Sequence, residues 1–503
     1  MKKSRLLSLL LALTLLASLV SLPTIGALAA YELPADLDIS EKVELVIYIL
    51  GDEKTGQQEM TDNFNKIALE KLNCTIKINW ISFAEWPNKY PLLFSSGEVF
   101  DMAYAATWLN FASMAQKGAF MPLDELWPKY APNNWALQSE TAKFQATSEG
   151  QLYAVPTLLA TYSGYGPLYR LDLVEGVEGW TGKMENFEDV ENYLALVKAN
   201  HPAVEPYYVY ASGSEADDQF MYYDGIYGIK GSTGDFLFID PSQESPQLFT
   251  YWEYERTPDF LQMMKRWNDN GYFPKSGLSD TDADKQKYGK VGLRFHNMDT
   301  YTDYVMNHPD YTWAYANFVK DVSNMSFVQD AMVVSNTSKH PDRALALYDM
   351  ITTDEEAFRA FFYGIEGVSY KVTEEDGVAY VNSLDVLAYP FSNMWSARTK
   401  AFYKNPVGYP QDAVELKLEW DAYIKDGVGT QKFRSFTIDT STVETEYAAC
   451  QSVHQQYWWP LELAYVDVEA GLKEYQEKME AAGINKVREV LQAQLDAYLI
   501  SIQ

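Results

Sequence analysis

The sequence predicts an α/β fold in which mainly parallel sheets are flanked by helices. Near the start of the 503-residue chain, the patterns follow the order strand, helix, strand, helix, strand. This order is typical of a parallel sheet wrapped by helices. A second α/β pattern begins near residue 186, and no Pro/Gly-rich linker separates the two. We therefore expect two α/β units that pack against each other.

The first unit carries five expected elements and three candidate ligand positions. Its first strand is an apolar, β-branched run typical of a buried strand, and its second alternates apolar and polar residues. The expected elements are strand 43–50, helix 60–68, strand 74–80, helix 86–94 and strand 100–104. Ligands collect at the carboxyl ends of strands in such sheets. Those ends lie at 51–52, 81–86 and 105–108.

The rest of the chain is less regular. A helix with acidic residues near its N-terminus is expected from residue 186 until Pro202. A strand at 206–210 then enters an acidic, Tyr-rich loop at 212–227. Further helices are expected at 341–351 and 354–362, with a tight turn at 364–370. The C-terminus is expected to be helical at 472–479 and again at 487–499, with an interruption at Gly483.

The first 29 residues predict a secretory signal peptide. Three basic residues precede an apolar run at 6–20, and small residues follow up to an A-x-A pattern at 27–29. The apolar run is too short for a membrane span and is followed by a cleavage pattern. We therefore expect an extracytoplasmic protein whose mature chain begins near Ala30 and is soluble and unlipidated.

Composition narrows the classes of ligand. The formal net charge of −30 disfavours nucleic acid and anionic membranes as partners, although such a charge also simply keeps a protein soluble. Aromatic residues make up 15% of the chain, with 37 Tyr and 13 Trp. Such rings offer apolar faces and polar edges, which suit the C–H faces and hydroxyls of sugars. The composition favours an aromatic-lined ligand cleft, with core packing as the alternative for any single ring.

Two cysteines in an exported protein could pair, but cysteine usage favours free thiols here, and histidine usage does not predict a metal site. Cys74 and Cys450 are the two cysteines, and we expect both to be buried free thiols that behave as small apolar residues. None of the five histidines lies in a ligand-spaced cluster, so a zinc site is not expected. We expect no other cofactor.

Four segments resemble one known family. They are QKGAFMPLD at 116–124, GQLYAVP at 150–156, SKHPDRAL at 338–345 with YGIEG at 363–367, and AGINK through QLD at 482–496. In this order they are similar to segments of the extracellular solute-binding proteins of ABC importers. The likeness is to carbohydrate-type, family 1-like members with a specialised C-terminal region. Each motif alone is moderately specific, but together they cover nearly the whole mature chain.

The resemblance implies a two-lobed, periplasmic-binding-protein-like fold with a ligand cleft between the lobes. One lobe is expected at 43–157 plus 331–384, and the other at 158–330 plus 385–503 including the helical C-terminal region. A carbohydrate, expected to be an oligosaccharide, would touch both lobes, stabilise the closed state and pass unaltered to an ABC permease. The resemblance thus implies a monomeric transport protein that catalyses no reaction.

One departure from the family concerns retention at the cell surface. Relatives from single-membrane bacteria usually carry a lipobox cysteine after the signal peptide, whereas this chain has Ala29-Ala30. Periplasmic retention, contact with the wall and free secretion all stay open.

Candidate ligand contacts in the first unit lie near inferred strand ends. Trp86 and Trp108 are expected to stack on a sugar face, with core packing as an equal alternative. Asp52 and Glu85 are expected to accept hydrogen bonds from sugar hydroxyls, unless each caps a neighbouring helix. Glu366 lies between two glycines and is expected to form a turn first and a ligand contact second.

Further candidates come from the second unit and the crossings between units. They are Tyr162, Tyr165, Asp224, Tyr227, Trp252 and Trp395. The first two flank glycines near the first crossing and are expected to line its floor. The resemblance places Trp395 close to the cleft. For the last four residues, packing is slightly favoured over ligand contact.

Two alternative functions stay open. An exported glycoside hydrolase needs two carboxylates about 5 to 10 Å apart. The 70 acidic residues always offer such a pair, but no Gly-flanked nucleophile motif or His–Asp pairing supports an enzyme. A peptide- or polyamine-type solute-binding protein is favoured by the negative charge. A binding protein returns its ligand unchanged, whereas a hydrolase cleaves it. If the protein is of the peptide or polyamine type, small cationic ligands would quench its tryptophan fluorescence and neutral glycans would not.

Overall fold

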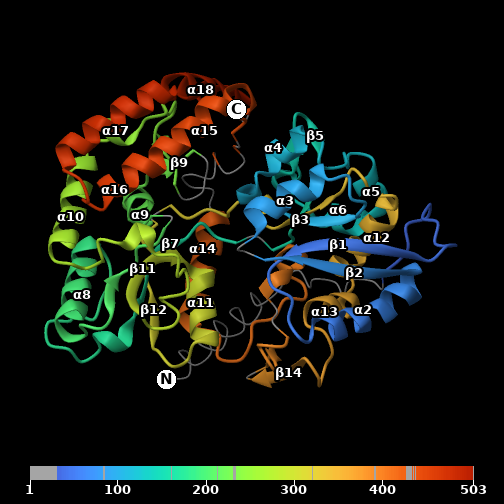
Figure 1. Ribbon diagram of the computed structural model, residues 1–503. Helices are drawn as coiled ribbons and strands as arrows, with labels where there is room; N and C mark the ends of the chain where they lie inside the picture. The colour runs from blue at the N-terminus through green and yellow to red at the C-terminus, as the bar shows by residue number, and fades with distance from the viewer. Residues whose placement is uncertain are drawn as a thin grey trace, which may run out of the picture.

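The chain folds into two α/β lobes that lie side by side, and the chain passes between them three times (Figure 1). In the computed structural model, the described residues are 31–82, 85–159, 161–211, 213–229, 234–319, 321–375, 377–389, 392–425, 433, 436 and 438–501. The predicted signal peptide, residues 1–29, lies outside the described residues. No helix of the described ranges is both long enough and apolar enough to span a membrane.

The first lobe is built on a five-stranded sheet with the order β2-β1-β3-β13-β6. Its strands are β1 (Val43–Leu50), β2 (Cys74–Ile81), β3 (Met102–Ala105), β6 (Ala154–Pro156) and β13 (Ala331–Val334). The first three strands run parallel, as the sequence predicts, whereas β13 runs antiparallel to both of its neighbours. The sheet is therefore mainly parallel, with one reversed strand.

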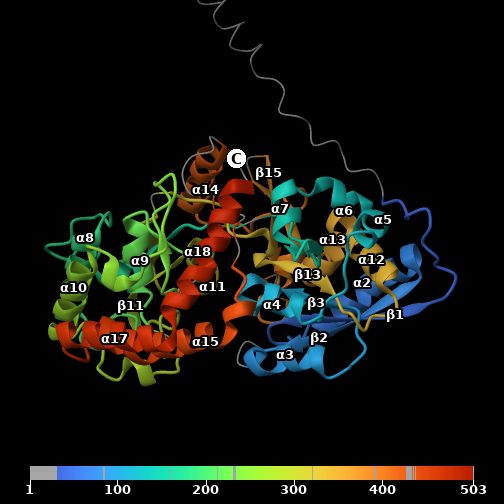
Figure 2. The same cartoon turned by 90° about the horizontal axis from the view of Figure 1, so that it is seen from above.

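Apolar residues on both faces explain why this sheet lies in the middle of its lobe. Leu45, Ile47 and Ile49 of β1 are buried, as are all four residues of β3, and helices pack on the two faces (Figure 2). These helices are α2 (Gln57–Leu72), α3 (Trp86–Ser95), α4 (Phe111–Gln116), α5 (Leu126–Tyr130), α6 (Pro132–Leu137), α7 (Glu140–Gln145), α12 (Pro341–Thr353) and α13 (Glu355–Phe362). Two hairpins, β4 (Thr147–Ser148) with β5 (Gln151–Leu152) and β14 (Tyr370–Glu375) with β15 (Val378–Ser383), complete the lobe.

The second lobe is built on a four-stranded sheet with the order β12-β7-β11-β8. Its strands are β7 (Tyr165–Arg170), β8 (Glu205–Tyr207), β11 (Val291–Asn297) and β12 (Trp313–Tyr315). A small ladder joins β9 (Tyr227–Gly228) to β10 (Phe238–Ile239). The helices before the C-terminal region are α8 (Phe187–Asn200), α9 (Ala216–Tyr223), α10 (Thr257–Asp269), α11 (Met298–Asn307) and α14 (Gln411–Lys425). The predicted helix starting near 186 is confirmed, with Asn186 as its N-cap.

One reversed strand in each sheet shows which sheet edges face the space between the lobes. β7 follows the first crossing and β13 follows the second, so each begins beside the other lobe and runs away from it. The other strands of both sheets run in the opposite direction. Their carboxyl ends therefore point toward the neighbouring lobe, which is the edge where α/β sheets place ligands.

Three crossing segments form the hinge, which consists of residues 157–159, 161–163, 323–330 and 398–410. Isolated bridges pair Leu158 with Thr399 and Tyr162 with Asn324. The backbone N–H of Thr157 donates to the carbonyl oxygen of Asp330 at 2.8 Å. These contacts hold the three segments to one another, so the lobes are joined by paired strands rather than by loose connections.

A helical C-terminal region packs on the second lobe and also reaches the first (Figure 2). Its elements are α15 (Glu444–Val453), a π-helical turn (His454–Trp458), α16 (Trp459–Glu462), α17 (Val468–Ala482) and α18 (Ile484–Ser501). Lys117 of the first lobe forms an ion pair with Glu444 at 3.1 Å. The rings of Phe144 and Tyr498 lie 6.5 Å apart between centroids. This region therefore touches both lobes at a place distinct from the hinge.

The α/β expectation is confirmed, and one local prediction is wrong. The segment 212–227 contains helix α9 rather than only a loop, because Asp217 and Asp218 occupy its first turn, where acidic side chains favour helix formation. The expectation of two buried free thiols, Cys74 and Cys450, is confirmed.

The predicted lobe boundaries stay a prediction, and the apolar cores bear on the last of them. Ala397 and Phe402, beyond the expected boundary at 384, pack in the core of the first lobe. Ala413 and Trp420 pack with Leu168 in a cluster of the second. The third crossing therefore reaches the second lobe between Phe402 and Ala413, and Arg398 and Thr399 lie at its first-lobe end.

Candidate ligand-binding site

An aromatic group lies where the strands of the first sheet end. Trp86 begins α3 after β2, and Trp108 lies on the short helical turn Thr107–Leu109 that directly follows β3. Their rings meet edge to face, with centroids 5.4 Å apart at 82°. Tyr104 contacts Trp108 at 6.1 Å and Trp395 at 6.2 Å between ring centroids. We call Trp86, Trp108 and Trp395 the tryptophan cluster.

The sequence predicts all three residues of the tryptophan cluster as ligand contacts. The fold brings them together although Trp86 and Trp395 lie over 300 residues apart in the chain. All three rings are half-buried against the core of the first lobe, whereas Tyr104 is 2% exposed beneath them. The partial exposure leaves aromatic surface at the sheet edge that points toward the other lobe. The three rings therefore pack against the core and also keep exposed surface, and ligand contact by each stays a prediction.

The two predicted carboxylates of the first lobe differ in their surroundings. Asp52 is exposed just after β1. Glu85 accepts a hydrogen bond from the Ser82 hydroxyl at 2.9 Å and pairs with Lys89 at 2.7 Å. Lys89 and Ser82 hold the pKa of the Glu85 carboxyl below its ordinary value. The Glu85 carboxylate is therefore ionised at neutral pH and already holds two partners, whereas the Asp52 side chain is exposed to solvent.

Four aromatic rings form a matching group in the second lobe. The Tyr165 ring at the start of β7 stacks on His296, with centroids 5.6 Å apart at 29°, and meets Tyr222 at 6.4 Å. Tyr222 in turn stacks on Tyr227 at 5.5 Å. The Tyr227 hydroxyl donates to the Asp321 carbonyl oxygen at 2.8 Å. We call Tyr165, Tyr222, Tyr227 and His296 the tyrosine group.

A charged pair lies beside the tyrosine group. Arg294 of β11 donates to the Glu215 carboxylate at 2.8 Å, and His296 lies 4.0 Å from the same oxygen. Burial, and then the positive charge of Arg294, lower the pKa of His296 well below its ordinary value, so its ring is neutral at neutral pH. The second Glu215 oxygen and the Arg294 Nε have no hydrogen-bond partner among the described residues.

These polar residues escaped the sequence reasoning, although a signal existed. Val291, Leu293 and Phe295 alternate with polar residues, which is the pattern of a strand with one buried face. Recognising that strand would have placed Arg294 and His296 on its other face. Glu215 carried a weaker signal because it is the N-cap of α9, a helix that lies in a predicted loop.

A second charged network lies at the hinge. Arg398 pairs with Asp330 at 2.7 Å, and Lys417 pairs with Asp299, at the start of α11, at 3.3 Å. Burial opposes ionisation of Asp299, but Lys417 and then Arg398 hold its pKa below the ordinary value. Opposite charges from the crossings and the second lobe therefore face each other at this end of the site.

The remaining candidates contact other parts of the chain. Tyr162, in the first crossing, donates to Asp421 at 2.7 Å and packs on Trp420. Asp224 accepts from the Tyr254 hydroxyl at 2.6 Å and pairs with Arg256. Trp252 packs edge to face on Tyr475 of α17, and Glu366 is exposed in a turn before β14. These contacts favour the packing alternatives for Asp224 and Trp252, and ligand contact by all four stays a prediction.

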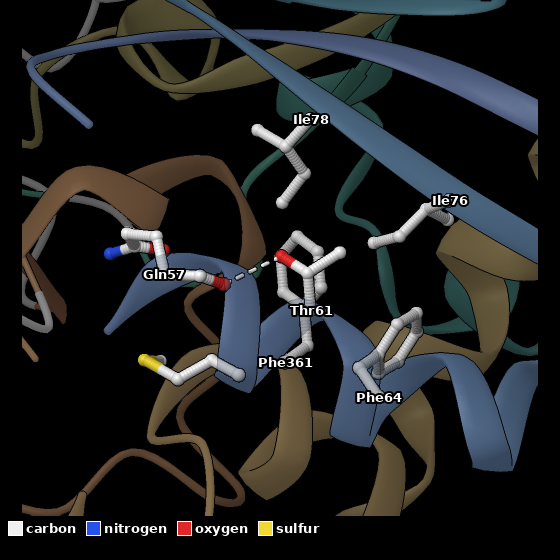
Figure 3. Close-up of a pocket in the computed structure, with 7 residues that line it drawn as sticks. Gln57, Thr61, Phe64, Ile76, Ile78 and Phe361 are labelled. Atoms are coloured by element: carbon white, nitrogen blue, oxygen red, sulfur yellow. Dashed lines mark hydrogen bonds between the residues drawn. The ribbon is translucent and has the colours of Figure 1, made fainter. Parts of the chain in front are cut away.

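A small cavity between α2 and β2 is not a site for a sugar (Figure 3). It is lined by Gln57, Met60, Thr61, Phe64, Ile76, Ile78 and Phe361. Its volume is about 10 Å³, which is close to the minimum for one water molecule. Across the described ranges, no group of three His, Cys, Asp or Glu side chains is arranged to hold a metal ion.

Two α/β lobes, a hinge of three paired segments and aromatic residues at facing sheet edges define a two-lobed binding protein. A family model of bacterial extracellular solute-binding proteins matches residues 55–358. The chain belongs to this family, as the resemblance of its motifs predicts. A domain of unknown function, DUF3502, matches residues 432–500, which are mostly the helical C-terminal region.

The alignments with known relatives cover nearly the whole chain. A carbohydrate ABC transporter substrate-binding protein of Streptococcus pneumoniae is 24% identical over 477 residues, 92% of each chain. The crystal structure of the N-glycan transport solute-binding protein NgtS from the same species, in complex with Man1GlcNAc, has a TM-score of 0.73 at 20% identity. That match covers 91% of this chain and 100% of the other. The complex of NgtS with Man5GlcNAc has a TM-score of 0.70 at 20% identity and covers 92% and 100%. These likenesses confirm the two-lobed fold.

Proposed function

We propose that this protein captures an oligosaccharide between its lobes and delivers it unaltered to an ABC permease. The observation that carries the proposal is the tryptophan cluster at the ligand-facing edge of one lobe, matched by the tyrosine group in the other. Aromatic faces suit the C–H faces of sugar rings, and tyrosine hydroxyls suit sugar hydroxyls. A ligand held by both groups would favour the closed form of the protein.

The relatives support a glycan built from mannose and N-acetylglucosamine as the ligand class. The S. pneumoniae N-glycan transport protein was crystallised with Man1GlcNAc and with Man5GlcNAc. Such glycans are neutral, which agrees with a binding protein of net charge −30. Two carboxylates of the site are already paired with guanidinium groups, Glu215 with Arg294 and Asp330 with Arg398, so neither pair offers a free charge to an ionic ligand.

Export, partner and oligomeric state belong to the same proposal. The residues 1–29 would direct export, and the closed form would be recognised by the membrane subunits of an importer. The protein would act as a monomer, because one chain supplies both lobes of the site. The two alternatives are weaker. The named relatives are transport proteins rather than enzymes, and their ligands are carbohydrates rather than polyamines.

Calorimetry with a small glycan set tests the proposal. Purified protein is titrated with Man1GlcNAc, Man5GlcNAc, maltotriose and spermidine, and each mixture is then examined by mass spectrometry. Saturable binding of a glycan with complete recovery, and a ligand-dependent rise in melting temperature, support a transport protein. Cleaved glycan supports the hydrolase, and binding of spermidine alone supports the polyamine alternative. Small-angle scattering measures closure, and an unchanged shape with a bound glycan contradicts the two-lobe mechanism.

A further inference from the structure

A buried tyrosine lies between the hinge and the tryptophan cluster. Tyr104 is 2% exposed, and its ring contacts both Trp108 and Trp395. Its hydroxyl points the other way and donates to the Asp330 carboxylate at 2.7 Å, with the Gln329 carbonyl oxygen at 3.0 Å. One side chain therefore touches the ligand-facing rings at one end and a hinge segment at the other.

The Asp330 side chain is tied to a second hinge segment. Its other carboxylate oxygen accepts from Arg398 at 2.7 Å, and the two side chains are 8% and 14% exposed. Because charges held away from water are tightly restrained by their partners, the positions of Asp330 and Arg398 are linked. The pair therefore joins the second crossing to the third.

The first crossing is hydrogen-bonded to the same two residues. The backbone N–H of Thr157 donates to the Asp330 carbonyl oxygen at 2.8 Å, and the Thr157 hydroxyl donates to the Arg398 carbonyl oxygen at 3.1 Å. Arg398 also donates through Nε to the carbonyl oxygen of Trp395 at 3.2 Å. Residues 157, 330 and 398 thus form one hydrogen-bonded group at the first-lobe end of the three crossings, where a change in the angle between the lobes begins, and Asp330 contacts Tyr104 while Arg398 contacts Trp395.

We propose that Tyr104, Asp330 and Arg398 are positioning residues that couple the hinge to the tryptophan cluster, so that lobe closure and the placement of Trp108 and Trp395 occur together. The inference rests on the proposed function, because it assigns the cluster to the ligand. In this inference the Tyr104 hydroxyl links the position of Asp330 to the position of the Tyr104 ring, and this ring contacts Trp108. Arg398 would act on Trp108 only through Asp330 and Tyr104.

Fluorine NMR of the full chain labelled with 5-fluorotryptophan tests the coupling without any ligand. The resonances of Trp108 and Trp395, and of the core residue Trp127, are assigned by single Trp→Phe replacements. Arg398→Met is then compared in two backgrounds, wild type and Tyr104→Phe, because the second removes the hydroxyl and keeps the ring. We expect Arg398→Met to shift the Trp108 resonance by more than its linewidth in the wild type and not in Tyr104→Phe.

Two further variants separate positioning from simple loss of structure. Arg398→Lys keeps the charge and should produce a smaller shift of Trp108, and it replaces Arg398→Met if that variant does not fold. Tyr193→Phe is the matched control, because Tyr193 is a fully buried tyrosine of the other lobe whose hydroxyl donates to the Arg170 carbonyl oxygen at 3.0 Å. Tyr193→Phe should leave Trp108 and Trp395 unmoved, and none of the hinge variants should shift Trp127.

Binding of Man5GlcNAc adds an arm that depends on the proposed function. Part of the free energy of the lost hydrogen bond to the Asp330 carboxylate should appear in binding, so the Kd of Tyr104→Phe should rise by about three- to tenfold, while Tyr193→Phe stays within twofold of the wild type. A Trp108 resonance that ignores Arg398→Met, or that moves equally in both backgrounds, overturns the coupling. A wild-type protein that binds none of the glycans overturns the proposed function instead, and the fluorine experiment still decides the coupling.

Discussion

Replacement of Trp108 by alanine should weaken both the fold and glycan binding. The variant loses an edge-to-face contact with Trp86 at 5.4 Å and a tilted contact with Tyr104 at 6.1 Å. Such aromatic pairs contribute about 0.5 to 1.5 kcal/mol each. Because the ring is half-buried, we expect the free energy of unfolding to fall by about 1 to 3 kcal/mol, less than for a fully buried tryptophan.

The expected loss of affinity comes from the exposed part of the same ring. Stacking of one aromatic face on a ligand contributes about 1 to 3 kcal/mol. This corresponds to a Kd that is about 5- to 150-fold weaker. Isothermal titration calorimetry with Man5GlcNAc measures the affinity, and urea denaturation without ligand measures the stability.

A matched variant separates the two effects. Trp135 of α6 is also half-buried in the first lobe and also meets another tryptophan edge to face, with Trp127 at 5.0 Å and 83°. Trp135→Ala should therefore lose similar stability while its affinity for the glycan is unchanged. If folded Trp108→Ala binds Man5GlcNAc as tightly as the wild type, or if both variants lose affinity equally, the assignment of Trp108 to the ligand site is refuted.

Three further predictions concern pH, the hinge and the thiols. Burial raises the pKa of Asp349 to about 6. The stabilisation from its protonated form is complete below the unfolded pKa of about 3.9 and is lost as pH rises through 6, so the wild type should lose about 2 kcal/mol relative to Asp349→Asn between pH 4.5 and 7 in urea denaturation; a pH-independent difference contradicts this. A methyl group at Gly164 would overlap the ring of Trp420, so Gly164→Ala should lower the free energy of unfolding by about 1 to 3 kcal/mol in the same assay, and an unchanged midpoint argues against it. Burial raises the pKa of Cys74 and of Cys450 to about 12, so both thiols should react with Ellman's reagent only after unfolding; rapid reaction of the native protein contradicts their burial.

Local patterns predict the first five elements of the first lobe, β1, α2, β2, α3 and β3, because each of them is decided by nearby residues. The apolar run at 43–50 matches β1, and the expected helix 86–94 matches α3 within one residue. In the second lobe, β7 and β11 pair across more than 120 residues, and neither is among the predicted strands, although residues 291–295 of β11 carry an alternating pattern. Their pairing depends on contacts that no short window of sequence contains.

The residues of the candidate site also differ in whether nearby or distant residues decide their positions. Strand ends identify Trp86 and Trp108, because a residue after a parallel strand lies at the ligand-facing edge whatever its distant partners are. The role of Tyr104 instead depends on Asp330, which is 226 residues away in the chain. Asp330 is in turn held by Arg398 from a third segment. Only the assembled hinge brings these three residues together, so periodicity and composition could not predict them.

The last helix gives the molecule a practical use. α18 ends near the seam between the lobes (Figure 2), and Tyr498 of this helix already touches Phe144 of the opposite lobe. The fluorescence of a fluorophore attached to α18 near this ring, with a quencher on α7, would increase when the two lobes move apart. The chain thus offers ready attachment points for a sugar biosensor that leaves the hinge and the aromatic rings untouched.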